Sequence, residues 1–267
     1  VREQLIKLGE DAIPFLEMAA KTENLEIQRI ASEIIQAIIP RQLLRQFSQL
    51  AQSSPSGHWN LETGVILLQK FGYPDEETNN LSQSLDLLAK EVSALVKRKQ
   101  SPEQTVKTLT RFLFFEKGFE GNKIDFLDPD NTYFSRVLDK KKGLPITLSA
   151  LCIFLGQRIG LPIVGVGLPG RYIAKYESLT QPIYFDPFDQ GRILSQEDCT
   201  RLVEEMGYHF EEHYLGAATS RETLTRMMNN LIMTYNKNSE PEKAKHLSDF
   251  IKALSGDLKQ NSSIRPY

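Results

Sequence analysis

The sequence predicts an α+β protein in which one buried helix packs on a small antiparallel sheet, with helical segments on both sides. Residues Ile146 to Leu155 are apolar around nearly the whole circumference of a helix, apart from Thr147 and Ser149, as in a helix buried on every side. Three short apolar or alternating runs follow and predict strands, at 162–168, 172–176 and 183–185. Helical periodicity dominates the flanking regions.

Composition sets broad limits on the class of protein. With 267 residues, 40% of them apolar, the chain can bury a substantial core and is expected to form one main domain with helical additions. A net charge of −2 gives no overall attraction to nucleic acid or to an anionic membrane. No window approaches the roughly 20 apolar residues of a membrane span, and no basic-then-apolar leader is visible. We therefore expect a cytoplasmic protein with no nucleic-acid partner, no membrane partner and no cofactor.

The first 39 residues predict two amphipathic helices that meet near Thr22. The pattern from Leu8 to Leu16, followed by Ile27 to Ser32, resembles one HEAT repeat, and we assign residues 1–52 to a HEAT-like segment. A single helix pair cannot cover both of its apolar faces. We expect it either to end a longer upstream array or to dock on the core.

The remaining organisation follows from turn signals and periodicity. The polar cluster Gln52 to Gly57 is the best candidate linker, and two helices are predicted from Leu61 to Leu95, separated near Pro74. We assign 58–205 to the central domain, with a helical part at 58–100 and the core at 101–205. The chain is expected to return to helix after Asp189. Residues 206–258 are assigned to a helical cap that resembles a tetratricopeptide pair, and 259–267 to a flexible tail.

Capping residues locate the helices of the core. Asn131 is a predicted N-cap, and Gly143, which follows Lys140-Lys-Lys142, is a predicted C′ residue. The lysines would complement the dipole at the end of that helix. Pro145 suits the first position of the buried helix, where its missing N–H costs nothing.

Four motifs carry a resemblance to a known family. They are Phe119-Glu-Gly-Asn122, Gly143-Leu-Pro-Ile-Thr-Leu-Ser149, Gly167-Leu-Pro-Gly-Arg171 and Tyr184-Phe-Asp-Pro-Phe188. In this order and spacing the chain resembles the SirB-type, transglutaminase-like family over roughly residues 60 to 205. The resemblance implies a transglutaminase-like (papain-like) core, and the wider superfamily is built around a Cys-His-Asp triad.

The resemblance also implies that this triad is degenerate. Counting back from Gly160-Leu-Pro162 puts Pro145 at the position of the cysteine, and Arg171 replaces the histidine, whereas Asp186 is retained. A shift of one helical turn would put Ser149 at the nucleophile position instead. We expect Arg171 and Asp186 to form an ion pair across adjacent strands, either as a structural clamp or with the guanidinium available to a carboxylate or phosphate.

The other candidate residues of the cleft are Asn122, Thr147, Ser149 and Cys152. Asn122 would either line the cleft or brace a loop, and we favour bracing. Cys152 lies two turns into an apolar helix and is expected to be a core thiol, and Cys199 lies away from the core motifs. Ser149 is expected to bond back to a helix carbonyl, because a serine nucleophile would need a base.

Two patterns suggest metal sites, and both have simpler interpretations. His209-Phe-Glu-Glu-His213 matches an inverted zinc-peptidase motif, in which two histidines share a helix face, but Gly207 and Gly216 leave only a short helix. The run from Asp125 through Asp128 to Asp130 lacks the glycine and glutamate of a calcium loop and is expected to be a turn.

The leading hypothesis is a catalytically inactive transglutaminase-like protein that acts as an interaction or scaffold module for an unknown protein partner. Loss of two triad residues motivates it. One alternative is an acyl-transferase or hydrolase of altered mechanism that uses Ser149 or Cys152 with Arg171. A second alternative is a zinc peptidase at His209 and His213.

Overall fold

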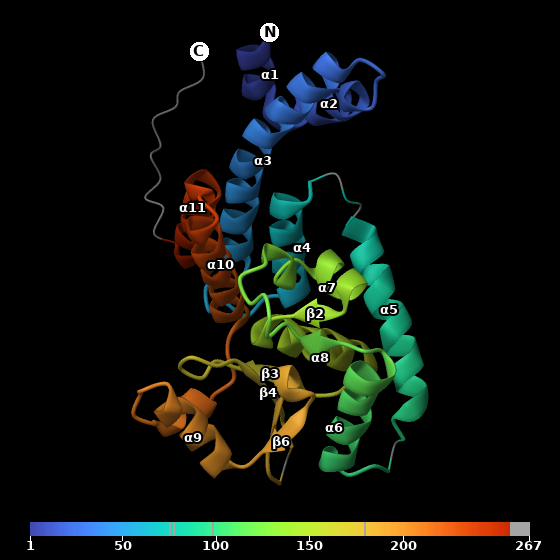
Figure 1. Cartoon of the computed structure of the whole chain (residues 1–267), viewed down its shortest axis with the longest axis vertical. Helices are drawn as coiled ribbons and strands as arrows, with labels where there is room; N and C mark the ends of the chain where they lie inside the picture. The colour runs from blue at the N-terminus through green and yellow to red at the C-terminus, as the bar shows by residue number, and fades with distance from the viewer. Residues whose placement is uncertain (75, 77, 98, 179, 257–267) are drawn as a thin grey trace.

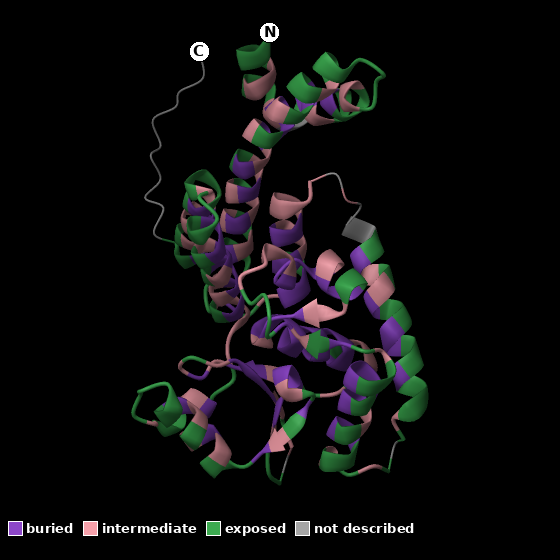
Figure 2. Cartoon of the chain, viewed as in Figure 1, coloured by how far each residue is buried: buried purple, intermediate pink, exposed green. Residues whose placement is uncertain are grey.

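The computed structural model describes residues 1–74, 76, 78–97, 99–178 and 180–256. Figure 1 shows an elongated molecule with the first helices at one end, a helical middle layer and a four-stranded sheet near the other end. Helix α8 (Pro145–Ile159) lies in the centre, and ten of its eleven residues from Pro145 to Leu155 are buried, as Figure 2 shows for the surrounding core. The predicted α+β architecture with a buried central helix is confirmed.

The amino-terminal region contains three helices rather than the predicted two. Helix α1 (Arg2–Leu8) ends at Gly9, where a positive φ of 62° introduces the 3₁₀ turn η1 (Gly9–Ala12) before α2 (Ile13–Ala20). Helix α3 (Leu25–Ser53) does not stop near residue 39 but continues through Pro40. Pro40 is buried, and its missing N–H removes one backbone hydrogen bond from the helix interior.

Helix α3 connects two hydrophobic clusters. Its first half packs with α1 and α2 around Ile34 and Ile38, whereas Leu43 and Phe47 belong to the main core. The ring of Phe47 lies 5.0 Å from that of Phe250 on helix α11 (Pro241–Ser255). The continuous helix therefore holds the amino-terminal helices on the rest of the protein.

The predicted helices between residues 61 and 95 are present and are followed by further helical structure. The elements of this layer are α4 (Leu61–Gly72), α5 (Thr78–Leu95), α6 (Pro102–Thr110) and the π-helical turn η2 (Arg111–Glu116). Ser101 and Gln104 form a capping box at the start of α6, which satisfies two backbone amides.

The main sheet is antiparallel, with the strand order β3-β4-β5-β6. Its strands are β3 (Ile163–Val166), β4 (Ile173–Tyr176), β5 (Ile183–Asp186) and β6 (Arg192–Leu194). The first three match the predicted runs, but β6 was missed, because the chain was expected to return directly to helix after Asp189. Side chains alternate between faces, so Ala174 and Phe185 pack with α8, while Ile173 and Leu194 pack in a second cluster with α9 (Gln196–Glu205).

Two capping predictions in the core are wrong. Asn131 ends the 3₁₀ turn η3 (Pro129–Asn131), and helix α7 (Phe134–Lys140) starts after Tyr133. Lys141, rather than Gly143, adopts the left-handed conformation at the end of α7. Gly143 instead lies in β2 (Lys142–Gly143), which pairs in parallel with β1 (Glu120–Gly121).

The last described helices are α10 (Ser220–Lys237) and α11 (Figure 1). Helix α11 packs on α3, and α10 packs on α11 and α4. The helix pair predicted for the cap is therefore present, and the tail predicted at 259–267 lies outside the described residues. Among the helices in the described ranges, no span has the length and apolar character needed to cross a bilayer.

Arg158 ties α8 to the helices that cover it. Its Nη1 and Nη2 atoms lie 2.7 and 2.9 Å from the two carboxylate oxygens of Glu62 on α4, and its Nε atom lies 2.6 Å from Asp86 on α5. Burial opposes ionisation of Glu62, but hydrogen bonds from Arg158 and Ser82 outweigh it and lower the pKa of the carboxyl group. The two ion pairs of Arg158 connect α8 to α4 and α5.

Candidate functional site

Helix α8 starts against the loop between β1 and α7. Pro145 occupies its first turn, and the preceding Leu144 provides no side-chain cap. The carbonyl oxygen of Asn131 accepts hydrogen bonds from the Thr147 hydroxyl at 2.8 Å and from the Leu144 amide at 3.3 Å. The helix start is thus connected to the loop through Thr147, and the side chain at the position assigned to the superfamily cysteine has no nucleophilic atom.

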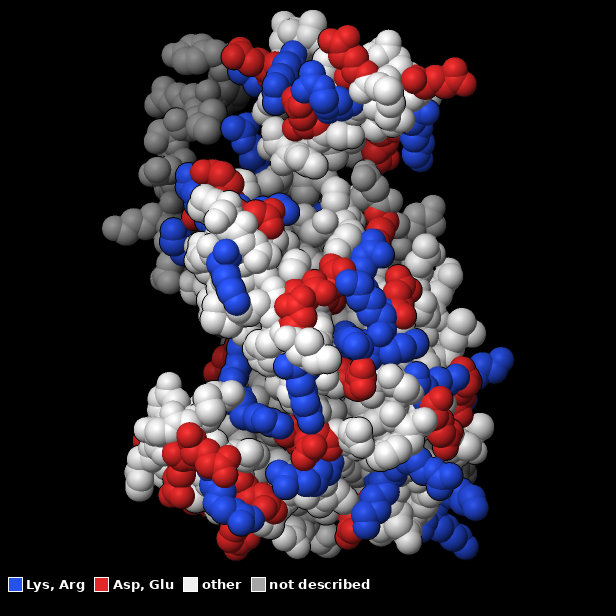
Figure 3. Space-filling view, viewed as in Figure 1, with Lys and Arg blue, Asp and Glu red and all other residues white. Residues whose placement is uncertain are grey.

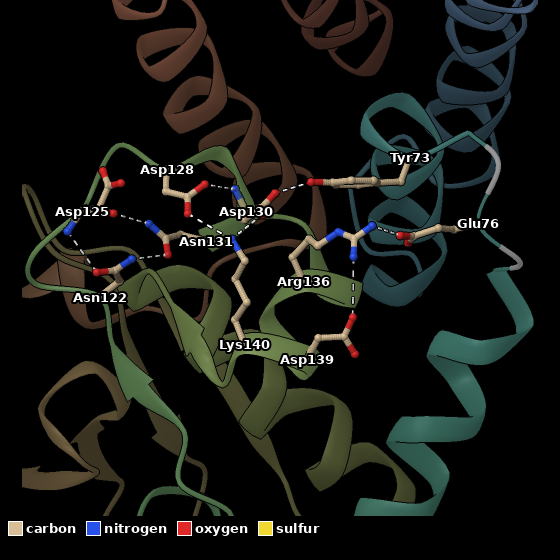
Figure 4. A network of polar contacts seen from close by, with 10 residues as sticks. All are labelled: Tyr73, Glu76, Asn122, Asp125, Asp128, Asp130, Asn131, Arg136, Asp139 and Lys140. Carbon is tan, nitrogen blue, oxygen red and sulfur yellow. Dashed lines mark hydrogen bonds and ion pairs between the residues drawn. The ribbon is translucent and has the colours of Figure 1, made fainter. Parts of the chain in front are cut away.

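Two buried asparagines brace this loop. Asn122 donates to the Oδ1 atom of Asn131 at 2.9 Å and accepts from the Asp125 amide at 3.0 Å (Figure 4). Asn131 in turn donates to the carbonyl oxygen of Asp125 at 2.7 Å. Asn122 therefore braces a loop, as predicted. Its partner is Asn131, which was expected to cap a helix.

Arg171 and Asp186 form the predicted ion pair. The Nε atom of Arg171 lies 2.9 Å from Oδ2 of Asp186, and Nη2 contacts the same oxygen. The Asp186 side chain is fully buried, and its Oδ1 atom accepts from the amides of Phe188 at 2.9 Å and Asp189 at 3.4 Å. Both carboxylate oxygens are therefore satisfied by the protein itself.

The position of Arg171 is set by a tight turn and an aromatic ring. Gly170 has a φ of 70°, and a Cβ atom there would lie 2.6 Å from Met206, so the turn requires glycine. The guanidinium carbon of Arg171 lies 5.5 Å from the centroid of the Phe188 ring. In the part of the chain that the structure describes, the guanidinium donates all its side-chain hydrogen bonds to Asp186.

The three candidate cleft residues on α8 are closed off from solvent. Thr147, Ser149 and Cys152 have no exposed surface. The hydroxyl of Ser149 has no hydrogen-bond partner among the described residues, so the predicted bond back to a helix carbonyl is absent. Neither Arg171 nor any other described residue forms a hydrogen bond with the serine hydroxyl.

Both thiols are buried, and burial disfavours their ionisation to thiolates. Burial raises the pKa of Cys152 far above its usual range. Burial, together with the negative charges of Asp198 and Asp186, raises the pKa of Cys199 to about 11. Cys199 lies near the start of α9, and its side chain is buried in the apolar cluster between this helix and the sheet.

The two histidines of the predicted zinc motif lie in different kinds of local structure. His209 lies in an irregular segment, and His213 lies in the 3₁₀ turn η5 (Glu212–Leu215), so the two side chains do not share a helix face as a zinc motif requires. His213 instead lies 3.2 Å from Glu211. Across the described ranges, no group of three or more His, Cys, Asp or Glu residues is arranged to hold a metal ion.

A charged network beside the loop was not predicted. Lys140 lies 2.6 Å from Asp130 and 3.4 Å from Asp128, so this lysine pairs with the loop as well as ending a helix. The hydroxyl of Tyr73 donates to Asp130, and Arg136 pairs with Glu76 (Figure 4). The partners are about 60 residues apart in sequence, and no local pattern indicates such pairing.

This network shifts the pKa values of its members. Burial and the hydrogen bond to Asp130 raise the pKa of Tyr73 to about 12. Burial also opposes ionisation of Asp130, but hydrogen bonds from Lys140 and Tyr73 outweigh it and lower the pKa of the carboxyl group. The ionised form of the Asp130 carboxylate therefore stabilises the loop that supports the start of α8.

Comparisons with known proteins agree with the fold. The family model described as "Transglutaminase-like superfamily" matches residues 79–229, more than half of the chain. The chain therefore belongs to the transglutaminase-like superfamily. No solved structure matches it.

The similar proteins include bacterial and animal sequences. A UPF0162 protein from Xylella fastidiosa is 26% identical over 200 residues, which are 73% of this chain and 71% of the relative. One from Vibrio cholerae is 28% identical over 137 residues, 51% of this chain and 50% of the relative. F-box only protein 21 from Mus musculus is 26% identical over 162 residues, 58% of this chain but only 25% of that protein.

Replacement of Arg171 by alanine is expected to lower the free energy of unfolding by about 3 kcal/mol, because it leaves the buried Asp186 carboxylate without its cation. Adding Asp186→Asn should restore part of this loss, since the uncharged amide can still accept from the Phe188 and Asp189 amides. Urea denaturation of the three proteins measures both effects.

Arg192→Ala is the matched control for this prediction. Arg192 also pairs with an aspartate, Asp189 at 3.1 Å, but both side chains are about half exposed. We expect a loss below about 1 kcal/mol for this surface pair. If Arg171→Ala is no more destabilising than Arg192→Ala, the pair is not a structural clamp.

Asp130→Asn should make stability less dependent on acid pH. Because the folded pKa of Asp130 is lowered, its stabilisation is present above the unfolded pKa of about 3.9 and is lost as pH falls through the folded pKa. The wild type should therefore exceed the variant at pH 7 by about 1 to 2 kcal/mol, and the difference should shrink in acid below about pH 4. Urea denaturation across this pH range checks the result.

The exposed Asp139 provides the control. Its carboxylate lies 3.7 Å from Arg136 and is 71% exposed, so Asp139→Asn should follow the wild-type stability at every pH. A constant difference between wild type and Asp130→Asn down to the lowest pH would contradict the proposed role of the Asp130 charge.

Proposed function

We propose that this protein is a catalytically inactive, SirB-type member of the transglutaminase-like superfamily that acts as a protein-interaction module. The ion pair between Arg171 and Asp186 is the observation that carries this proposal. At the position assigned to the superfamily histidine, arginine keeps its proton at working pH and cannot act as a general base. Its guanidinium already forms an ion pair with the buried Asp186.

The geometry of α8 supports the same proposal. Pro145 provides no nucleophile at the helix start, and the nearest alternatives, Ser149 and Cys152, are buried. An acyl-transferase or hydrolase of altered mechanism would need a substrate to reach one of these two side chains and a base to activate it. The unpaired hydroxyl of Ser149 is the one observation that favours this second candidate.

The amino-terminal helices provide the best candidate interaction surface. Large apolar side chains are exposed there, including Phe15 and Met18 on α2, at 73% and 72%, and Leu25 on α3, at 78%. A cavity of about 580 Å³ lies between α1, α2 and α3 and includes Leu5 and Ile30 in its lining. Exposed apolar surface of this kind is characteristic of sites that bind other proteins.

The domain organisation proposed above is compatible with such a module. We propose that residues 1–52 form a HEAT-like segment and that residues 206–258 form a tetratricopeptide-like cap, on either side of a central domain at 58–205. F-box only protein 21 of Mus musculus, of which this chain covers 25%, is an example of a similar sequence inside a much longer protein.

A protein partner fits the surface better than nucleic acid or a membrane. Acidic and basic side chains are interspersed on the face shown in Figure 3, and the net charge is −2. Nucleic-acid binding depends on concentrated positive charge, which gives binding its salt dependence. Apolar contacts on α2 and α3 would instead favour an apolar face of another protein.

The double variant Phe15→Asp and Met18→Asp should lose its partner while remaining folded, because both side chains are exposed and support no core. Affinity capture from the native host identifies the partner, and calorimetry with the two purified proteins gives the dissociation constant. We expect weakening of at least about tenfold, since exposed aromatic and apolar anchors dominate protein interfaces.

Met233→Asp is the matched control, because Met233 is 51% exposed on α10, away from this surface. It should bind as the wild type does. A purified partner that binds the double variant and the wild type equally well would exclude this surface from the interface.

A further inference from the structure

A second cavity, of about 320 Å³, lies between the end of β3, the segment before α10, and α10 itself. The backbone amide of Ala218 donates to the carbonyl oxygen of Gly165 at 2.8 Å, which holds that segment beside β3. Much of the lining consists of small residues, among them Gly167, Gly216 and Ala217. These residues leave space in front of the longer side chains from α10.

Arg226 brings a partly buried cation into this cavity. Its Nη1 atom donates to the carbonyl oxygen of Leu168 at 2.9 Å, and its guanidinium carbon lies 5.6 Å from the centroid of the Tyr172 ring. In the described part of the chain, no carboxylate forms an ion pair with it. Burial lowers the pKa of Arg226, which reflects a charge that the protein leaves poorly compensated.

Glu222 lines the same cavity one helical turn earlier. Its Oε2 atom accepts from the amide and the hydroxyl of Thr219, at 2.7 and 2.9 Å, in the capping box of α10. The Oε1 atom accepts no hydrogen bond from the described residues. Glu222 and Arg226 have the i,i+4 spacing on α10 at which opposite charges often pair, yet the structure shows no ion pair between them.

We propose that this cavity binds a small zwitterion of the α-amino-acid class. The ligand's carboxylate would meet the guanidinium of Arg226, whose planar fork suits a carboxylate. Its ammonium group would meet the Oε1 atom of Glu222. The volume is at the low end of the roughly 300–1,000 Å³ of ligand pockets, which suits a single amino acid better than a nucleotide.

Two opposite charges make a simple anion a poorer ligand for this site. A phosphate would gain from Arg226 but would be repelled by Glu222, whereas a zwitterion interacts favourably with both. The inference does not depend on the proposed scaffold role, because the cavity is separate from the amino-terminal helices and from the Arg171–Asp186 pair.

Isothermal titration calorimetry of the full chain with each free amino acid tests the proposal. Acetate and inorganic phosphate serve as comparison ligands that carry negative charge but no ammonium group. We expect at least one amino acid to bind the wild type at millimolar concentration or below. Arg226→Gln should weaken that binding at least tenfold. Glu222→Gln should weaken binding of the amino acid but not binding of acetate. It should keep the helix cap, since glutamine also serves in a capping box.

Two further variants separate ligand binding from folding. At Gly167 a Cβ atom would meet its nearest neighbour, Arg226 Nη1, at 3.6 Å, so Gly167→Leu should fill the cavity without a clash at the Cβ position. This variant should abolish amino-acid binding, although it keeps Arg226 and the wild-type melting temperature. Arg221→Gln, on the same helix but outside this cavity, should bind normally.

Three results would overturn the proposal. One is a wild type that binds no amino acid at millimolar concentration. Another is amino-acid binding that survives both Arg226→Gln and Gly167→Leu. The third is phosphate binding that depends on Arg226 without binding of any amino acid, which would make the site an anion site instead.

Discussion

The burial of α8 is the constraint on which the rest of the structure depends. This helix is apolar on nearly all sides, so it needs a cover around its whole circumference. The sheet covers one side through Ala174 and Phe185, and helices α5 and α10 cover the others. Arg158 is the main polar connection from α8 to this cover.

A second constraint acts at the end of β5, where the fold buries the Asp186 carboxylate. An isolated buried charge is very costly, so its neighbours must satisfy it. Arg171 and the amides of Phe188 and Asp189 do so. In the parent superfamily the resemblance assigns this aspartate to a catalytic triad. In this structure the carboxylate at that position accepts hydrogen bonds from Arg171 and from the backbone amides that follow β5.

The sequence predicted those features that depend on local patterns. Apolar periodicity predicted α8 and three of the four strands of the main sheet, and the motif spacing predicted that Arg171 would face Asp186. The caps around α7 were wrong because Asn131 uses its side chain to hold the loop through Asn122, a tertiary contact that overrides the capping preference. Strand β6 has only three residues, too few for a periodic pattern to show.

The polar contacts between distant segments could not have been predicted in this way. Tyr73 meets Asp130, and Arg136 meets Glu76, and only the fold brings these partners together. The sequence gives no sign that Arg226 and Glu222 line one cavity, because the segment near Ala218 is brought beside them only by the fold. The unpaired Ser149 hydroxyl also contradicts the local expectation for a serine within a helix.

The central proposal is that this fold holds no activated nucleophile. Its most direct test is the rate at which iodoacetamide alkylates the native protein from mildly acidic to mildly alkaline pH. Wild type, Cys152→Ser and Cys199→Ser together identify each thiol. Because both thiols are buried and have raised pKa values, labelling should be slow and should accelerate only under conditions that unfold the protein. Fast labelling of native Cys152 below neutral pH would reveal an activated thiolate and would contradict the account.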